Sequence, residues 1–163
     1  WRKSCSCIFV PRCSTTVYRR KGGIDMDLGF DIAQSLSGNL IQSANGDLST
    51  FEKNNAIMQD IKNEAITYPG DLFYNEEYGW GLYDFMHREI DLTDDLLKTE
   101  IKHRISTNLA KRDYLDMSSL DIEIIFNEFG TFEIQISFRF EDEDEARQMK
   151  VNLDRVGIEV VLV

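Results

Sequence analysis

Apolar residues recur at helical spacing in the stretch 51–66. Ser49 and Glu52 stand three residues apart, the spacing of a capping box at a helix start. The apolar residues of this stretch that share one helix face are Ala56, Ile57, Ile61 and Ala65. Pro69-Gly70 follows, and proline cannot continue the backbone ladder. The pattern predicts a helix over 51–66 that ends before the proline.

A second helical pattern covers residues 93 to 110. Thr93 is a suitable N-cap, and Asp94 and Asp95 follow it, where carboxylates meet the positive end of the helix dipole. One apolar stripe is formed by Leu97, Ile101, Ile105 and Leu109. The pattern predicts a long amphipathic helix with this stripe buried.

Apolar and polar residues alternate from Leu120 onward, with Ile125 as an apolar residue on the otherwise polar face. The stretch 120–126 alternates, a turn-like Asn127-Glu128-Phe129-Gly130 follows, and 132–140 alternates again. The residues that alternation places on one face are Leu120, Ile122, Ile124, Phe126, Phe132, Ile134, Ile136, Phe138 and Phe140. A β-hairpin with one buried face is expected.

The last 23 residues are expected to form a short helix and a final strand. The acidic run 141–145 is typical of a solvated helix start, and the apolar residues that then follow helical spacing are Ala146, Met149, Leu153 and Val156. Gly157 would end that helix, and Ile158 to Val163 has high β-propensity.

The order of these elements predicts a small single α+β domain, with the hairpin and the C-terminal strand packed on amphipathic helices. Residues 46–163 would form this domain, and 26–45 would form an irregular arm before it. The stretch 72–86 is rich in aromatic residues without a clean period, so a packed loop with a short helical turn is expected there.

Charge divides the chain into a basic leader and an acidic body. Residues 1–25 hold six of the 18 Lys and Arg residues, one of the 29 Asp and Glu residues and all three cysteines, although the whole chain has a net charge of −11. An acidic body argues against nucleic-acid binding, which depends on Lys and Arg displacing counterions. No apolar run approaches the length of a membrane span. The absence of cysteine after Cys13 suggests a cytosolic body.

The leader fits neither a secretory signal nor a zinc site. Its apolar run is cut short by Pro11 and Arg12, and its cysteines lack paired spacing and a fourth ligand. Lys21-Gly22-Gly23 can be back-translated into a purine-rich ribosome-binding sequence placed just before Met26. We therefore expect residues 1–25 to be leader or upstream sequence and the native protein to start at Met26.

The common catalytic and cofactor motifs are absent from the sequence. There is no Walker loop, no dinucleotide fingerprint and no His-Glu-x-x-His, and the only histidines are His87 and His103. No metal, no cofactor and no catalytic residue is predicted. A glycoside hydrolase stays the alternative, because Asp71, Glu76, Glu77 and Asp84 lie near the aromatic stretch that would serve as a sugar-binding wall.

An ordered set of short motifs resembles the contractile-tail baseplate wedge family. The set comprises Gly46-Asp47-Leu48, the first helix, Thr67-Tyr68-Pro69-Gly70-Asp71, Asn75-Glu76-Glu77-Tyr78-Gly79 and Leu82. The family has historically been called lysozyme-like, and the chain is similar above all to members from PBSX-type defective prophages and R-type bacteriocins. The resemblance runs from about Gly46 to Phe140.

The resemblance implies a structural subunit of a contractile tail, not an enzyme. Its partners would be other baseplate wedge proteins, the tail sheath protein and hub or tube-end proteins. It would assemble in the bacterial cytoplasm and then form part of a released virion or phage-tail-like particle. The lysozyme label does not establish catalysis, so a muralytic tail hydrolase is the alternative and not the main interpretation.

The resemblance also points to interaction residues. Relatives often carry a Glu-Pro-Arg motif after the long helix, used in wedge assembly. Here Lys111 and Arg112 occupy that place, and only Arg112 matches the motif's basic residue. Asn75 and Gly79 belong to the shared loop motif and are expected to shape it.

The C-terminal strand supplies the last predicted interaction site. Ile158, Val160 and Leu162 belong to a strand with few charges, which would be an aggregation hazard as a bare sheet edge. A partner strand that completes the sheet would remove that hazard. We expect this edge to pair with a strand of the first sheath ring.

Overall fold

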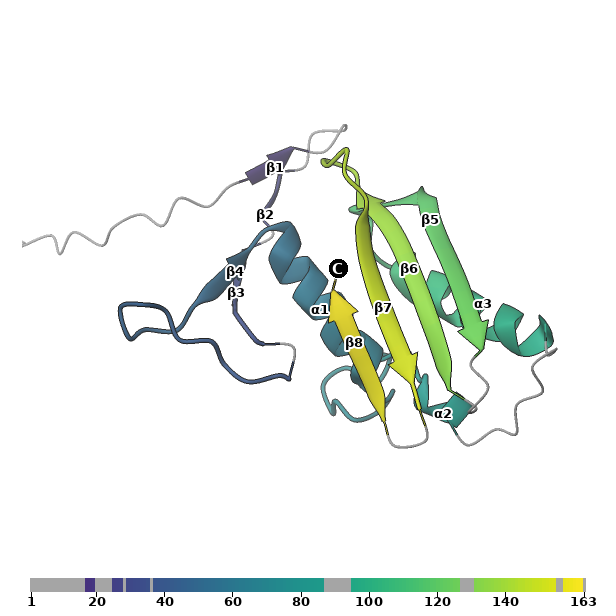
Figure 1. Cartoon of the computed structure of the whole chain (residues 1–163). Coiled ribbons are helices and arrows are strands. Elements are labelled where there is room, and N and C mark those ends of the chain that lie inside the picture. Colours follow the sequence, from purple (N-terminus) through teal and green to yellow (C-terminus); the bar gives the residue numbers. More distant parts are fainter. Residues whose placement is uncertain are drawn as a thin grey trace, which may run out of the picture.

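The computed structural model describes residues 17–19, 25–27, 29–35, 37–86, 95–126, 131–154 and 157–162. Two short strands, β1 (Val17–Arg19) and β2 (Asp25–Asp27), pair with each other at the N-terminal end (Figure 1). The expected start at Met26, the Thr93 cap and the turn at 127–130 stay predictions, because none of these features is tested by the described residues.

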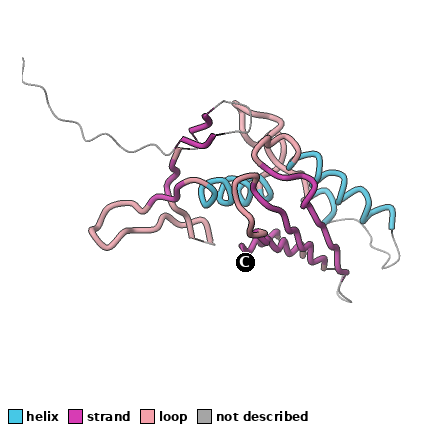
Figure 2. The backbone as a smooth tube through the Cα atoms, turned by 90° about the horizontal axis from the view of Figure 1, so that it is seen from above, coloured by secondary structure: helices cyan, strands magenta, loops and turns pink. Residues whose placement is uncertain are grey.

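A four-stranded antiparallel sheet forms the centre of the molecule. Its strands are β5 (Leu115–Phe126), β6 (Phe132–Phe140), β7 (Arg147–Leu153) and β8 (Ile158–Leu162), in the spatial order β5-β6-β7-β8. Two helices, α1 (Asn54–Ile66) and α3 (Asp95–Leu109), lie on the same side of this sheet (Figure 2). The short helix α2 (Tyr83–Met86) follows the aromatic loop. The predicted single α+β domain is confirmed.

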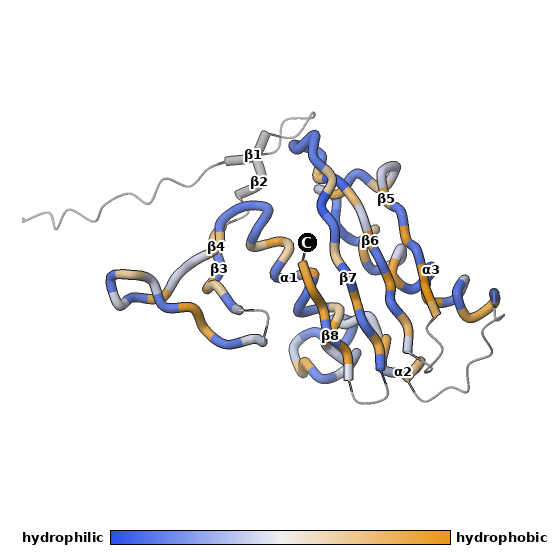
Figure 3. Tube along the Cα trace, in the orientation of Figure 1, coloured by the Kyte–Doolittle hydropathy of each residue, from blue (hydrophilic) through white to orange (hydrophobic). Residues whose placement is uncertain are grey.

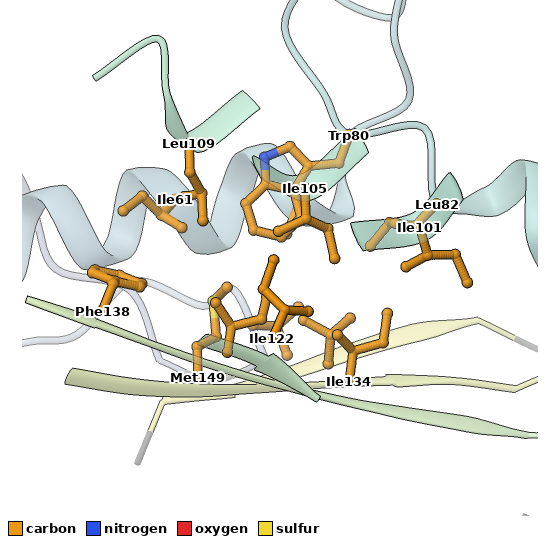
Figure 4. Packing of buried hydrophobic residues seen from close by; sticks show 14 of the residues in the cluster. Ile61, Trp80, Leu82, Ile101, Ile105, Leu109, Ile122, Ile134, Phe138 and Met149 are labelled. Carbon is orange, nitrogen blue, oxygen red and sulfur yellow. The ribbon is translucent and has the colours of Figure 1, made fainter. Parts of the chain in front are cut away.

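The core lies between the two helices and the sheet. Alternation places Phe132, Ile134, Ile136, Phe138 and Phe140 of β6 inside, each at most 2 % exposed. The predicted stripe of α3 is buried against them (Figure 4). Side chains from the loop fill the space between the layers, namely Trp80, Leu82 and Phe85. The expected packed loop is thus part of the core.

One predicted helix is wrong, because residues 147–153 form strand β7 and not a helix. Met149 pairs with Ile136, and Val151 pairs with Ile134, in a regular antiparallel register. The predicted helix face included Ala146, Met149 and Leu153 but not Val151. In the structure Val151 is fully buried, whereas Ala146 is exposed. Pairing with the exposed edge of the hairpin and burial of every second residue outweigh the helical spacing.

The first helix begins later than the capping box predicts. Strand β4 (Thr50–Glu52) occupies the expected first turn, and Lys53 at the N-cap position has φ 54° and no side-chain cap bond. Phe51 pairs with Asp31, so the backbone of this stretch belongs to the arm. Pairing in the arm therefore displaces the predicted cap.

The N-terminal arm contains short paired strands where an irregular segment was expected. Strand β3 (Phe30–Ile32) pairs with β4, and the bridges Gln34↔Leu40 and Gln42↔Leu48 extend this pairing (Figure 1). The turn predicted at Asn45-Gly46-Asp47 is confirmed, since Gly46 has φ 84° and its N–H donates to Ser43 O. In the structure the arm does not end at 45 as expected but continues to Glu52, and it is a small antiparallel meander beside α1.

Gln59 of α1 fixes the arm to the domain. Its side chain is 2 % exposed, accepts a hydrogen bond from Gln34 N at 2.7 Å, and donates to Asp31 Oδ2 and Ile32 O, both at 2.8 Å. Lys62 Nζ donates to Ser35 O at 3.0 Å one turn further along the helix.

Among the described residues no helix is long and apolar enough to cross a membrane.

Candidate functional site

Arg112 lies at the centre of a charged cluster between α1 and the segment that follows α3. Its Nη1 is 2.6 Å from Glu64 Oε2, and its Nη2 is 2.7 Å from Asp60 Oδ2. The side chains of Arg112 and Glu64 are only 10 % and 5 % exposed, whereas that of Asp60 is 46 % exposed. A planar guanidinium can bind two carboxylates at once, which a lysine at this place could not do with the same geometry.

The cluster shifts the pKa values of the groups around it. Burial lowers the pKa of Arg112, but the hydrogen bond to Asp60 and the charge of Glu64 outweigh burial, so the net pKa of Arg112 is raised. Burial and then the neighbouring Asp60 raise the pKa of the Tyr78 hydroxyl well above its usual range. Tyr78 therefore stays protonated and donates to Asp60 Oδ1 at 2.9 Å.

The aromatic loop is attached to α1 through the same carboxylate that binds Arg112. Trp80 Nε1 donates to Glu64 Oε2 at 3.1 Å, and Trp80 N donates to Glu64 O at 3.3 Å. Gly79 has φ 121°, and a Cβ atom built there would lie 2.5 Å from Thr67 O. Only glycine lets the two ends of the loop approach this closely. The predicted shaping role of Gly79 is supported by this geometry.

The outer part of the loop is a series of turns. Asp71 N donates to Tyr68 O, Asn75 N donates to Leu72 O, and Tyr78 N donates to Asn75 O, at 3.0 to 3.2 Å. The backbone of Asn75 thus takes part in two successive turns, and its side chain is exposed. Lys111 Nζ lies 3.5 Å from Glu77 O, so Lys111 and Asn75 are brought to the same loop.

Strand β8 is the outermost strand at one edge of the sheet. Among the described residues it pairs with β7 alone. Asp154 N donates to Gly157 O across the β7–β8 turn, which makes this a hydrogen-bonded pair. Hydrogen-bonded and non-hydrogen-bonded pairs alternate along an antiparallel ladder. In the continuous register from Leu153↔Ile158 to Met149↔Leu162, the backbone N–H and C=O groups of Ile158, Val160 and Leu162 therefore point to the open edge.

The side chains of these three residues contribute to the core. Val160 is 3 % exposed, and Ile158 and Leu162 pack against the core cluster. Figure 3 shows the hydrophobic character of β8 at this edge. The predicted edge residues thus combine buried or partly buried side chains with outward backbone groups, whereas the nearly buried Arg112 lies at a different place in the fold.

A solved baseplate chain is similar to this protein. It belongs to the anti-feeding prophage (AFP) baseplate, determined by cryo-EM with six-fold symmetrisation, and has a TM-score of 0.47 and 20 % sequence identity. The similarity covers 77 % of this chain and 86 % of that chain. Neither a protein-family model nor a curated protein matches the chain. Membership of the wedge family and the named partners stay predictions.

The carboxylates considered for a hydrolase do not form an isolated pair. Asp84 Oδ2 is 2.7 Å from Arg104 Nη1, and Asp84 Oδ1 accepts a hydrogen bond from Tyr68 OH. Asp71, Glu76 and Glu77 are exposed. A general acid for glycoside cleavage needs an apolar setting that favours its protonated form. None of these four residues is buried.

Metal ligands are not clustered in the part of the chain that the structure describes. No group of three His, Cys, Asp or Glu residues with metal-binding geometry occurs there. His103 is exposed on α3, as expected for a surface histidine.

Asp60 and Glu64 are the site residues that sequence reasoning missed. They stand four residues apart on α1, so they share one helix face, and this spacing next to an otherwise apolar stripe was a usable signal. Their partner Arg112 is 48 or more residues away, and nothing in the local pattern specifies that pairing.

Proposed function

We propose that this protein is a structural subunit of the baseplate of a contractile phage tail or phage-tail-like bacteriocin, and that it is not an enzyme. The observation that carries the proposal is the open edge of β8. The motif set from Gly46 to Leu82 supports it, because the motif residues Gly79 and Tyr78 are those that hold the aromatic loop against α1.

The β8 edge is suited to β-strand addition. Three residues direct main-chain donors and acceptors to an edge where no other described strand pairs with them. A partner strand that pairs with them would be fixed in register by main-chain bonds. Their side chains already belong to the core, so the strand does not need to refold when a partner binds. We propose that this partner is a strand of the tail sheath protein in the first sheath ring.

Charge would keep free subunits from pairing with each other. The chain has a net charge of −11, and Glu159 in the middle of β8 is exposed. Two copies of the same edge would bring these charges together, and like charges in neighbouring strands oppose pairing. A less acidic partner strand would not meet this repulsion.

The N-terminal arm offers a second contact surface. Residue parity places Phe30, Ile32, Leu40 and Leu48 on one face of the arm, and they are between 43 % and 60 % exposed. The opposite face contacts α1, where Ala33 is fully buried. An exposed apolar face of this kind marks a site of protein contact. We assign it to another wedge protein or to a hub or tube-end protein.

Arg112 would support assembly indirectly. Its guanidinium already binds Asp60 and Glu64, so in the proposed function it holds the aromatic loop in place. Lys111, which is exposed beside Glu77 of that loop, would be the residue that contacts a partner. The subunit would assemble in the bacterial cytoplasm and leave with the particle.

Purified particles give a direct test of the proposed function. The protein, tagged and expressed in its source bacterium, should copurify with tail particles at a fixed copy number through a sucrose gradient. Isolated protein should not clear a suspension of purified cell walls. The muralytic hydrolase would be supported instead if the isolated protein clears cell walls, if Glu76→Gln or Glu77→Gln abolishes this clearing, and if the particles contain none of the protein.

A further inference from the structure

The tip of the aromatic loop exposes two large aromatic side chains. Phe73 is 91 % exposed and Tyr74 is 72 % exposed. Their rings pack edge to face, with centroids 5.2 Å apart and planes at 90°. Aromatic side chains this exposed leave a large apolar area in water, and such residues are enriched among the hot spots of protein interfaces.

The loop is held in shape before any partner binds. Turn hydrogen bonds on both sides of the aromatic pair, at Asp71 and Asn75, define the tip. The base of the loop is held by Gly79 against Thr67 and by Trp80 against Glu64. A preformed loop loses little conformational entropy on binding, so its aromatic pair can contribute more of its contact energy to affinity.

The charges around the pair indicate the chemistry of the partner. Asp71, Glu76 and Glu77 flank it and are exposed. Residues 66–86 contain no lysine or arginine, and Lys111, whose Nζ lies 3.5 Å from Glu77 O, brings one positive charge to the loop, so three carboxylates face one ammonium group and the rim is acidic on balance. An acidic rim around an apolar centre complements an apolar pocket bordered by Lys or Arg. The perpendicular rings also leave no single flat platform for a sugar, which favours a protein partner.

We propose that Phe73 and Tyr74 form a docking anchor that inserts into an apolar pocket, bordered by basic residues, on a neighbouring protein of the assembled particle. This inference rests on the proposed assembly function. It adds a third contact surface, distinct from the β8 edge and from the arm.

Site-specific crosslinking in assembled particles tests the anchor. The probe is p-benzoyl-phenylalanine in place of Phe73, with the same probe in place of Leu96 as a matched control. Leu96 is 79 % exposed on α3, away from the loop motif. Irradiation should join Phe73 to one peptide rich in apolar residues and Lys or Arg, at least about tenfold more efficiently than Leu96. Equal, diffuse crosslinking at both positions would overturn the anchor.

Competition between variants provides a second test of the anchor. Phe73→Ala/Tyr74→Ala, expressed together with wild type, should lose at least about tenfold of its share in particles, since hot-spot truncations weaken association by that much or more. Its melting temperature should match wild type, because both side chains are exposed. Leu96→Ala should keep its share. Glu76→Lys/Glu77→Lys should also lower incorporation.

The outcomes separate this inference from the function on which it rests. If wild-type protein is present in particles and Phe73→Ala/Tyr74→Ala keeps the same share of particles as wild type, the anchor is overturned and the assembly function stays intact. Absence of the wild-type protein from particles overturns both. Binding of the protein to purified cell walls that is lost in Phe73→Ala would assign the aromatic pair to a carbohydrate and also overturn the anchor.

Discussion

Arg112 and Glu64 form a nearly buried ion pair at 2.6 Å that joins the segment after α3 to the last turn of α1. The same Glu64 carboxylate also accepts the Trp80 indole N–H. One contact therefore holds together two helices and the loop between them.

Breaking this pair should cost substantial stability. Arg112→Met leaves Glu64 buried without its partner, and such a change typically costs about 3–5 kcal/mol. Denaturant unfolding of Arg112→Met, Glu64→Gln and the double variant should show strong coupling, with the double variant losing less than the sum of the two. Arg139→Met is the matched control, because its pair with Asp116 is exposed, and it should unfold like wild type. Additive losses would contradict the pair's central role.

Gly79 should tolerate no side chain. Gly79→Ala places Cβ against Thr67 O, and Gly79→Val adds β-branching at a positive φ, so both should lower the yield and stability of the folded protein. Gly70→Ala is the control, since Gly70 also has a positive φ of 93° but has open space around it. Its cost should be limited to backbone strain of roughly 1–3 kcal/mol. Thermal melting compares the three, and equal losses at both positions would show that the close approach is unimportant.

Ile105 should be essential for the core. It is 0 % exposed on α3, and Ile105→Asp would bury a carboxylate without a partner, at a cost above roughly 3 kcal/mol. That is a large share of the stability of a small domain. The control His103→Asp changes an exposed position of the same helix and should melt near wild type. A wild-type melting curve for Ile105→Asp would contradict the buried stripe.

Stability should fall in alkaline solution, partly through Tyr78. Its pKa is raised in the folded state, so its contribution is fully present below the unfolded pKa of about 10 and is lost as pH rises above it. Lys62, whose pKa burial lowers, acts in the opposite sense below about pH 10.5. Comparison of Tyr78→Phe with wild type cancels the effect of Lys62. The variant should lose stability less steeply between pH 9.5 and 11 in denaturant titrations, and equal slopes would contradict the buried hydroxyl.

The sequence predicts those elements that short-range patterns specify. Alternation locates β6, and the stripe from Leu97 to Leu109 locates α3, because burial on one face dictates both periods. The pattern fails at Met149 and Val151, where apolar spacing fits a helix and a strand equally well and only pairing with β6 decides. It fails again at Lys53, where the arm takes the residues of the expected cap.

The candidate site, like the fold, could be predicted from the sequence only where local patterns specify it. Gly79 could be predicted as a residue that shapes the loop, because it belongs to the motif 75–79 of the resemblance, but its close approach to Thr67 O is known only from the structure. The Arg112 cluster could not, since Asp60 and Glu64 meet Arg112 only after α1 and α3 have packed on one sheet. The edge role of β8 was predicted from its composition, but the outward direction of its backbone groups depends on the register with β7.

The most direct measurement compares Val160→Pro with Val160→Ala in assembled particles. Proline removes the outward N–H at the centre of β8 and is tolerated at a sheet edge. Alanine keeps the N–H but loses side-chain contacts in the same core position. Both proteins should enter baseplates, as detected by mass spectrometry of purified particles. Electron micrographs should then show normal sheaths for Val160→Ala and baseplates without sheaths for Val160→Pro. Full-length sheaths in normal number on Val160→Pro particles would contradict strand addition at this edge.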